Sequence, residues 1–366
     1  MGAAAIAPAL SSWVSAAHAD EKPWWLGDGL PQESAGTPKI AAPIDLSKGI
    51  TDEAIRSVKQ LGVSHVLAGG PPIPWTVSQL QPIVDRLKSH GITLGNLMID
   101  GFPNTLYGRP ERDEEIEKIR QSIQAAGKVG LPVIEYNFYA HRAMEGYYEE
   151  TGRGGAGLTG VDYDHMKNLP PLPREGAHTL QEMWSNITYF LKAVIPVAEK
   201  ANVRLALHPN DPPFPFSRGS QQIMATLDGW KHLIAIVDSP SNGITFDCGV
   251  TRELGEDPVA VCRYFGNRDR INHMHYRHPH VMKPYEKYDE GFIDEGDVNM
   301  FAVMCELLNV KYTREVYPEH PRALDYDRQR GPIHGYPGGG GYTGDAYDIA
   351  YAKAMLQAAL VSRGHN

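Results

Sequence analysis

Four residues that commonly bind metal ions stand where short strand-like stretches end. His208 follows the alternating stretch 203–207 and comes directly before Pro209, while Asp247, His275 and Glu319 stand near the ends of three later stretches. Each would bring an imidazole or a carboxylate to the tip of a strand. Two nitrogen and two oxygen donors suit Mn²⁺ best, with Fe²⁺ or Co²⁺ also suited, Mg²⁺ less favoured and Zn²⁺ allowed. The pattern predicts one shared divalent metal site, with Mn²⁺ the favoured ion.

Two of these positions have a close competitor. His273 lies on the same face of its stretch as His275, but His275 is nearer the tip and is preferred. Asp247 competes with Cys248, because alternation along a strand lets only one of two neighbours face inward. Asp247 is favoured because it keeps phase with Thr245, and Cys248 stays the alternative, which would shift the preference toward softer metals.

For these residues to meet, the strands must run parallel with their carboxyl ends on one face. Eight strand-like stretches alternate with eight helix-like stretches along the chain. The strands are expected at residues 39–46, 63–68, 92–99, 131–139, 203–207, 244–249, 271–277 and 312–320. The helices are expected at residues 51–61, 77–90, 111–128, 179–201, 220–237, 258–265, 298–308 and 346–361. This alternation predicts an α/β protein, a single-domain (β/α)₈ TIM barrel with its active site at the carboxyl ends of the strands.

The periodic pattern breaks after the fourth strand. Residues 141–177 combine closely spaced glycines with tyrosines and acidic residues, and a structureless insertion of this length is typical of a functional loop or lid. A mobile surface excursion is an equally good interpretation. The expected catalytic domain spans residues 39–366, preceded by an irregular lead at residues 20–38.

Composition excludes some classes of function. The net charge is −9 and no Lys/Arg cluster occurs, so a nucleic-acid-binding surface is not expected. Three cysteines form neither a complete disulfide framework nor a zinc-finger spacing.

Residues 1–19 have the features of a secretory signal without its basic start. Residues 2–17 are uncharged and apolar, and Ala17-His18-Ala19 resembles a cleavage site. The opening resembles the apolar stretch that comes after a twin-arginine motif, so we interpret the segment as the remnant of a longer signal; a plain alanine-rich tail is the alternative. A functional signal would place the protein in the periplasm or outside the cell, and otherwise it would be cytoplasmic. The apolar run is too short to span a bilayer, which needs about 20 residues.

Several segments resemble the mannonate dehydratase family, metal-dependent lyases on the xylose-isomerase-like TIM barrel. They are Leu-His-Pro-Asn-Asp-Pro-Pro at 207–213, His-Tyr-Arg at 275–277, Gly-Asp-Val-Asn-Met at 296–300, Pro-Glu-His at 318–320, Tyr-Asn-Phe at 136–138 and Gly-Tyr at 341–342. Three departures stand out. Asn210 replaces an aspartate, Glu319 replaces another, and the family's cysteine ligand aligns without gaps to Asp247.

The resemblance implies that water is removed from a sugar acid such as D-mannonate to give a 2-keto-3-deoxy acid. The metal would act as a Lewis acid. His320 and Tyr342 match the acid and base residues, although His320 could instead orient Glu319 and Tyr342 could be a loop aromatic. Arg277 would pair with the substrate carboxylate. Further substrate contacts are expected from Asn137, Asp211 and Arg142, with Arg142 the weakest of these assignments.

Two other functions fit the same residues. A sugar isomerase or epimerase on this barrel is favoured if Asp247 rather than Cys248 binds the metal. An exported carbohydrate-binding barrel without turnover is the third. In each case the expected partner is a small sugar or sugar acid, and a homo-oligomer is compatible with the barrel's outer helices.

Overall fold

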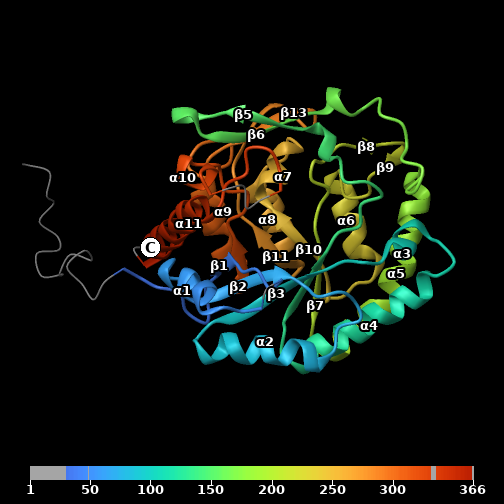
Figure 1. The fold of residues 1–366 in the computed structure, drawn as a ribbon, viewed down its shortest axis with the longest axis horizontal. Coiled ribbons are helices and arrows are strands. Elements are labelled where there is room, and N and C mark those ends of the chain that lie inside the picture. Colours follow the sequence, from blue (N-terminus) through green and yellow to red (C-terminus); the bar gives the residue numbers. More distant parts are fainter. Residues whose placement is uncertain (1–29, 48, 331–334, 365–366) are drawn as a thin grey trace, which may run out of the picture.

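The computed structural model describes residues 30–47, 49–330 and 335–364. Eight parallel strands close into a barrel in the order β1-β14-β11-β10-β7-β4-β3-β2 (Figure 1). The strands are β1 (Lys39–Pro43), β2 (His65–Gly69), β3 (Thr93–Ile99), β4 (Val133–Tyr136), β7 (Arg204–Leu207), β10 (Asn242–Asp247), β11 (Ile271–His275) and β14 (Glu315–Tyr317). Each lies within or close to a predicted strand, so the predicted (β/α)₈ barrel is confirmed.

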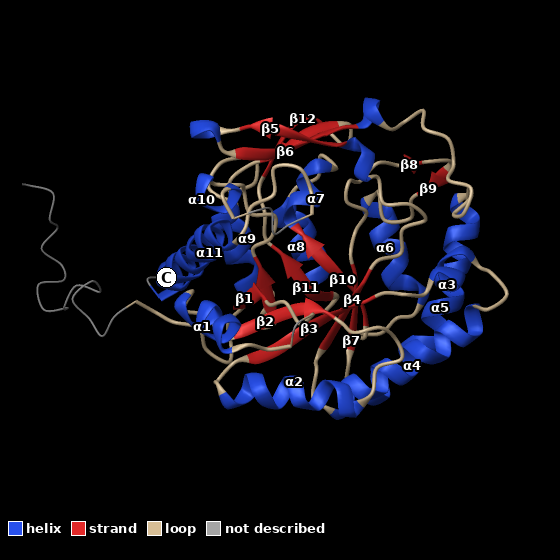
Figure 2. Ribbon diagram, viewed as in Figure 1, coloured by secondary structure: helices blue, strands red, loops and turns tan. Residues whose placement is uncertain are grey.

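Helices surround the barrel (Figure 2). They are α1 (Asp52–Gln60), α2 (Val77–Ser89), α3 (Pro103–Tyr107), α4 (Arg112–Lys128), α5 (Leu180–Ala201), α6 (Leu227–Ile236), α7 (Cys248–Glu253), α8 (Pro258–Gly266), α9 (Met300–Asn309), α10 (Asp325–Arg328) and α11 (Tyr342–Gly364). Side-chain caps explain several starts: Thr76 and Thr179 each form a capping box with the residue three positions later. Buried apolar side chains such as Ile187, Leu191 and Val194 then face the barrel.

The strand register brings the predicted metal-binding residues side by side. Asp247 on β10 lies opposite His275 on β11, and His275 lies opposite Tyr317 on β14. On the other side, β10 pairs with β7, whose last residue directly precedes His208. The neighbouring strands β10, β11 and β14 therefore end at the same level, and β7 ends opposite Ile244 of β10.

The insertion after β4 is more regular than predicted. It contains β5 (Tyr147–Thr151) and β6 (Gly157–Asp162), which join β12 (Pro279–Lys283) and β13 (Lys287–Glu290) in an antiparallel sheet of order β12-β13-β6-β5. The short 3₁₀ turns η2 (Met144–Gly146), η3 (Arg153–Gly155) and η4 (Tyr163–His165) flank its strands. Gly160 is required here, because a Cβ on it would lie 2.4 Å from the ring of Tyr148 on the paired strand. The expectation of a structureless insertion is therefore wrong.

The predicted helix over residues 220–237 is wrong in its first part. Thr226 caps the helix by accepting a hydrogen bond from the Gly229 amide, so α6 begins only at Leu227. The residues before it form a hairpin of β8 (Phe216–Ser217) and β9 (Ser220–Gln221). The short helices α3, α7 and α10 were not predicted.

The two N-terminal predictions have different outcomes. Residues 30–38 have no regular structure, as predicted for the lead, while residues 1–29, including the proposed signal, lie outside the described part. Among the described residues, no helix combines the length and apolar character that crossing a membrane requires.

Candidate metal centre

His208, Asp247, His275 and Glu319 converge at the carboxyl ends of β7, β10, β11 and β14. Each offers a ligand atom, and the four atoms lie within 4.8 Å of one another, buried from solvent. The structure thus brings together all four residues that the sequence marks as metal ligands.

His208 is oriented by the groups behind it. Its Nδ1 lies 2.7 Å from the Pro209 carbonyl oxygen and 2.8 Å from the Tyr139 hydroxyl. We infer that Nδ1 carries the proton and donates it, which leaves the lone pair of Nε2 directed into the cluster. Burial lowers the pKa of His208 to about 4, so the ring is neutral, as a ligand must be.

His275 is oriented from inside the barrel by Glu135, a buried residue of β4. Glu135 Oε1 lies 3.3 Å from His275 Nε2 and accepts a hydrogen bond from Thr245, while Asn96 donates to Oε2. A proton on His275 Nε2 leaves Nδ1 facing the cluster. The competing His273 lies below, with its Nε2 3.9 Å from Glu135 Oε2.

The donor set fits a cation. His208 Nε2 and His275 Nδ1 lie only 3.0 Å apart, and His275 Nδ1 lies 3.0 Å from Glu319 Oε1. Two imidazole lone pairs this close repel each other unless a positive charge lies between them. A divalent ion held by two neutral imidazoles and two carboxylates meets that need.

Asp247 and Cys248 have different surroundings. Asp247 is fully buried, lies 3.9 Å through Oδ2 from His208 Nε2, and caps α7 by accepting from the Val250 amide. Cys248 begins α7, and its thiol donates to the Arg277 carbonyl oxygen at 3.3 Å. The structure therefore places Asp247 in the cluster and leaves Cys248 outside it, with a thiol whose pKa is raised by burial.

Arg277 is surrounded by protein carboxylates. Its guanidinium nitrogens lie within 4.0 Å of five of them: Asp211, Asp247, Glu253, Glu290 and Glu319. Its side chain is only 3 % exposed. This placement suits a group that neutralises and holds the ligand carboxylates, and it does not favour the expected contact with a substrate carboxylate.

The pKa values of three groups in the centre reflect the same charges. Burial would raise the pKa of Glu319, but His275, His320 and Arg277 outweigh it and hold the pKa well below its usual range. Burial would lower the pKa of His320, but Glu290 and Glu319 raise it. Burial raises the pKa of Asp247 to about 7 in spite of Arg277. The centre therefore combines crowded carboxylates with few cations.

His320 lies next to the cluster, as predicted. Its Nε2 is 3.6 Å from Glu319 Oε2 and 4.0 Å from Asp211 Oδ2. Asp211 also accepts from the Tyr147 hydroxyl at 3.2 Å. His320 thus has one ring nitrogen directed toward the predicted ligands.

Tyr342 does not reach this site, which corrects the expected juxtaposition with His320. It begins α11 on the outside of the barrel, is 36 % exposed, and its hydroxyl donates to the Ser57 carbonyl oxygen. The aromatic ring next to His320 belongs to Tyr336, whose centroid lies 4.7 Å from that of the imidazole. Because four glycines separate the two tyrosines, the sequence did not indicate which tyrosine points toward His320.

Two predicted substrate residues border a cavity beside the metal centre. The cavity measures about 380 Å³ at the ends of β3 and β4, and Asn137, Tyr139, His141 and Arg142 contribute to its lining. Tyr139 also contacts His208, so the cavity adjoins the ligands. Arg142 donates to the Asp211 carbonyl oxygen at 3.3 Å.

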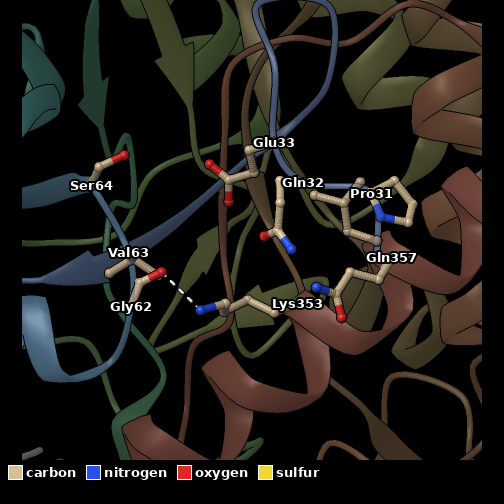
Figure 3. A pocket seen from close by; sticks show the side chains of 9 residues that line it. Pro31, Gln32, Glu33, Gly62, Val63, Ser64, Lys353 and Gln357 are labelled. Carbon is tan, nitrogen blue, oxygen red and sulfur yellow. Dashed lines mark hydrogen bonds between the residues drawn. The ribbon is translucent and has the colours of Figure 1, made fainter. Parts of the chain in front are cut away.

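A second cavity lies at the opposite end of the barrel. It measures about 260 Å³ between the lead residues 31–33, the start of β2 and α11 (Figure 3). Lys353 Nζ donates there to the Gly62 carbonyl oxygen at 2.8 Å, and Glu33 accepts from the Ile40 amide. These charged groups are already engaged in holding the lead and α11 to the barrel.

Sequence reasoning missed the residues that support the ligands. Glu135 lies within the predicted strand 131–139 but was given no role, and Glu253 and Glu290 lie on elements that were not predicted. The sequence did offer one indication for Glu135: a lone carboxylate in a buried strand is unfavourable unless other polar groups pair with it.

Comparison with known proteins identifies a matching family model and similar enzymes. Residues 155–363 match the family model described as D-mannonate dehydratase (UxuA). The mannonate dehydratase of Thermotoga petrophila is 28% identical over 324 residues, covering 77% of this chain and 88% of that protein. The enzyme of Streptococcus pneumoniae (strain 70585) is 25% identical over 319 residues, covering 78% and 86% respectively.

Solved structures agree on the fold. The crystal structure of mannonate dehydratase from Streptococcus suis serotype2 superposes with a TM-score of 0.79 at 24% identity, covering 89% of this chain and 96% of that one. An L-ribulose 3-epimerase gives a TM-score of 0.58 at 12% identity, covering 90% and 97%.

Proposed function

Because this chain belongs to the mannonate dehydratase family, we propose that it is a hydro-lyase that converts D-mannonate to its 2-keto-3-deoxy acid. The observation that carries the proposal is the buried group of His208, Asp247, His275 and Glu319, with His320 beside it. A metal-binding group and a separate proton-accepting group are what this elimination needs.

The four ligand residues would hold a divalent ion, for which we favour Mn²⁺. When bound, the ion supplies a Lewis acid for the carboxylate and hydroxyl oxygens of the substrate. The protein's own part is to aim both imidazoles, through Tyr139 behind His208 and Glu135 behind His275.

His320 is the residue placed to move a proton. Its Nε2 faces the ligands and can accept the proton alpha to the substrate carboxylate, while the electron pair of that bond is delocalised into the carboxylate. The hydroxyl group on the next carbon then takes up the proton from His320 Nε2 and leaves as water, which gives an enol that tautomerises to the keto acid. We propose that the cavity lined by Asn137 and Arg142 receives the sugar chain.

The test is to incubate the Mn²⁺-loaded protein with D-mannonate and to follow the 2-keto-3-deoxy acid by its carbonyl chemistry and mass. Product should appear, and His320→Gln should lower kcat by about 10²- to 10⁴-fold, the usual contribution of a general base. Absence of product with mannonate and with the other hexonates would refute the proposal.

Asp247 in the ligand set favours one second candidate, a sugar isomerase or epimerase. A carboxylate here, where the family has a cysteine, suits hard metals such as Mn²⁺ or Mg²⁺. Incubation with ketohexoses and aldoses, followed by chromatography of the sugars, decides between the two. Turnover of a neutral sugar without turnover of mannonate would establish the second candidate.

Export is a separate proposal. If Ala17-His18-Ala19 is cleaved, mass spectrometry of the protein isolated from its own cells should find Asp20 at the mature N-terminus. A mature chain that still contains the residues before Asp20 would argue against it.

A further inference from the structure

We propose that Glu290, on the inserted sheet, is the positioning residue that holds His320 with Nε2 toward the metal ligands. The inference rests on the proposed function for its catalytic consequence but not for its geometry. It assigns the inserted sheet a part in the chemistry.

The first step is the contact between the two residues. Glu290 Oε2 lies 2.6 Å from His320 Nδ1, and both side chains are at least nine-tenths buried. A carboxylate accepts hydrogen bonds only, so Nδ1 must donate, and in the neutral imidazole this proton on Nδ1 leaves the lone pair on Nε2. Nε2 is the nitrogen that faces Glu319 Oε2 at 3.6 Å. The pair therefore selects the tautomer that a base requires.

The second step is that Glu290 is itself held in place. Arg322, which is 1 % exposed, donates through Nη2 to Glu290 Oε2 at 3.2 Å and through Nη1 to the Glu290 carbonyl oxygen at 3.0 Å. The same guanidinium donates through Nε to the His320 carbonyl oxygen at 2.8 Å. One cation thus fixes both members of the pair.

The third step concerns His320 itself. Its backbone has φ +53°, a left-handed conformation that is uncommon for residues other than glycine, and its ring lies against Tyr336. Strained backbone persists only where the surroundings enforce it. Here the Glu290 and Arg322 contacts do so, and they set the direction of the imidazole.

Glu290 belongs to the inserted antiparallel sheet and not to the barrel. It lies on β13, where it pairs with Thr159 of β6, and Thr159 Oγ1 accepts from Arg322 Nη1 at 2.8 Å. The carboxylate that orients His320 therefore comes from the accessory sheet and not from the barrel.

The kinetic test compares Glu290→Gln with Glu290→Asp and with Asp289→Asn. Asp289 is the neighbour on the same strand, its side chain faces the other side, and its Oδ2 lies 3.6 Å from His280 Nδ1, so it is a matched control. Glu290→Gln should lower kcat about 10²- to 10⁴-fold with KM changed less than about threefold, as when the carboxylate behind a catalytic histidine is lost. Glu290→Asp should recover part of the loss, and Asp289→Asn should match the parent.

The second readout does not depend on turnover. Protein labelled with ¹⁵N-histidine and loaded with diamagnetic Mg²⁺ should show a strongly downfield imidazole N–H proton, absent from His320→Gln and displaced in Glu290→Gln. A parent without this resonance, or a folded Glu290→Gln variant with kcat within about threefold of the parent, overturns the inference. If the resonance behaves as expected but mannonate is not converted, the pair stands and the proposed function fails.

Discussion

Asp247 performs three tasks with one carboxylate. Its Oδ1 caps α7, while its Oδ2 accepts from Arg277 Nε at 2.9 Å and faces His208. A neutral side chain of the same shape would keep the cap but would leave Arg277 and the cluster short of one negative charge. Asp247 therefore connects the start of α7 to the candidate metal centre.

Substitution of Tyr139 tests how strongly its hydroxyl orients the His208 imidazole. Removing its hydroxyl in Tyr139→Phe leaves the Pro209 carbonyl as the remaining partner of Nδ1. Loss of such an outer partner typically costs 10- to 100-fold in metal affinity or activity, so we expect about a tenfold loss in Mn²⁺ affinity. Isothermal titration of parent and variant measures it, and equal affinities would show that Pro209 alone suffices.

Tyr342 provides the opposite prediction. Because its hydroxyl contacts only the Ser57 carbonyl oxygen on the outside of the barrel, Tyr342→Phe should change kcat less than about threefold. Steady-state kinetics on the proposed substrate checks this. A loss of two orders of magnitude would restore the role that the family resemblance suggested for it.

These residues show what a sequence can reveal about a site. His208, Asp247, His275 and Glu319 could be found because strand ends in a barrel share one face. Glu290 could not, because it reaches His320 only through an antiparallel pairing between β6 and β13, which lie far apart in the chain. The position of Tyr342 depends on how a glycine-rich segment turns, which residue types do not determine.

Ion pairs hold the starts of several barrel strands together on the face opposite the metal centre. Arg204 at the start of β7 donates to Asp269 Oδ2 at 2.7 Å, and Arg314, just before β14, donates to Asp269 Oδ1 at 2.8 Å. Asp269 itself precedes β11 and has φ +54°. Asp269 thus links the starts of β7, β11 and β14, which belong to the run β14-β11-β10-β7 of the barrel.

This link predicts a small dependence of stability on pH. Burial would raise the pKa of Asp269, but Arg204 and Arg314 outweigh it and lower the pKa. A lowered folded-state pKa contributes stability that is present above the unfolded-state value, near 3.9, and is lost as the pH falls through the folded-state value. Asp269→Asn, which tolerates the left-handed backbone, should therefore destabilise the protein at pH 7 and lose this effect below about pH 4.

The expected size is modest, because the Asp269 side chain is 53% exposed and water screens the pair. Exposed pairs contribute up to about 1 kcal/mol. Urea unfolding of parent and variant at pH 7 and near pH 3 measures the difference. A difference that grows toward acid would contradict the assigned direction.

The barrel could be predicted from the sequence, and the accessory sheet could not. Strand-like and helix-like patterns alternate along the chain with short connections, and each pattern can be recognised within its own segment of the sequence. The sheet β12-β13-β6-β5 joins two separate insertions. Its glycines, such as Gly160, are needed for close packing, but they weaken the sequence pattern by which a strand is recognised. Pairing between strands that lie far apart in the chain, such as β6 and β13, leaves no local pattern in the sequence.

Metal binding should stabilise the whole fold, because the ligands come from four strands that are together only in the native state. An ion at 100 times its Kd adds about 2.7 kcal/mol to the free energy of unfolding. Chelation with EDTA followed by dialysis should lower Tm by several degrees, and Mn²⁺ should restore it. An unchanged Tm in differential scanning calorimetry would mean that no ion binds preferentially to the folded chain.

The proposed ligand set is tested most directly by the metal content of the purified protein, compared with that of Asp247→Ala and Cys248→Ala, each also assayed for conversion of D-mannonate. We expect about one divalent ion per parent chain, loss of ion and conversion in Asp247→Ala, and retention of both in Cys248→Ala, because the structure places Asp247 in the cluster. Loss of both from Cys248→Ala with retention in Asp247→Ala would contradict this ligand set, and a metal-free parent without activity would contradict the shared centre itself.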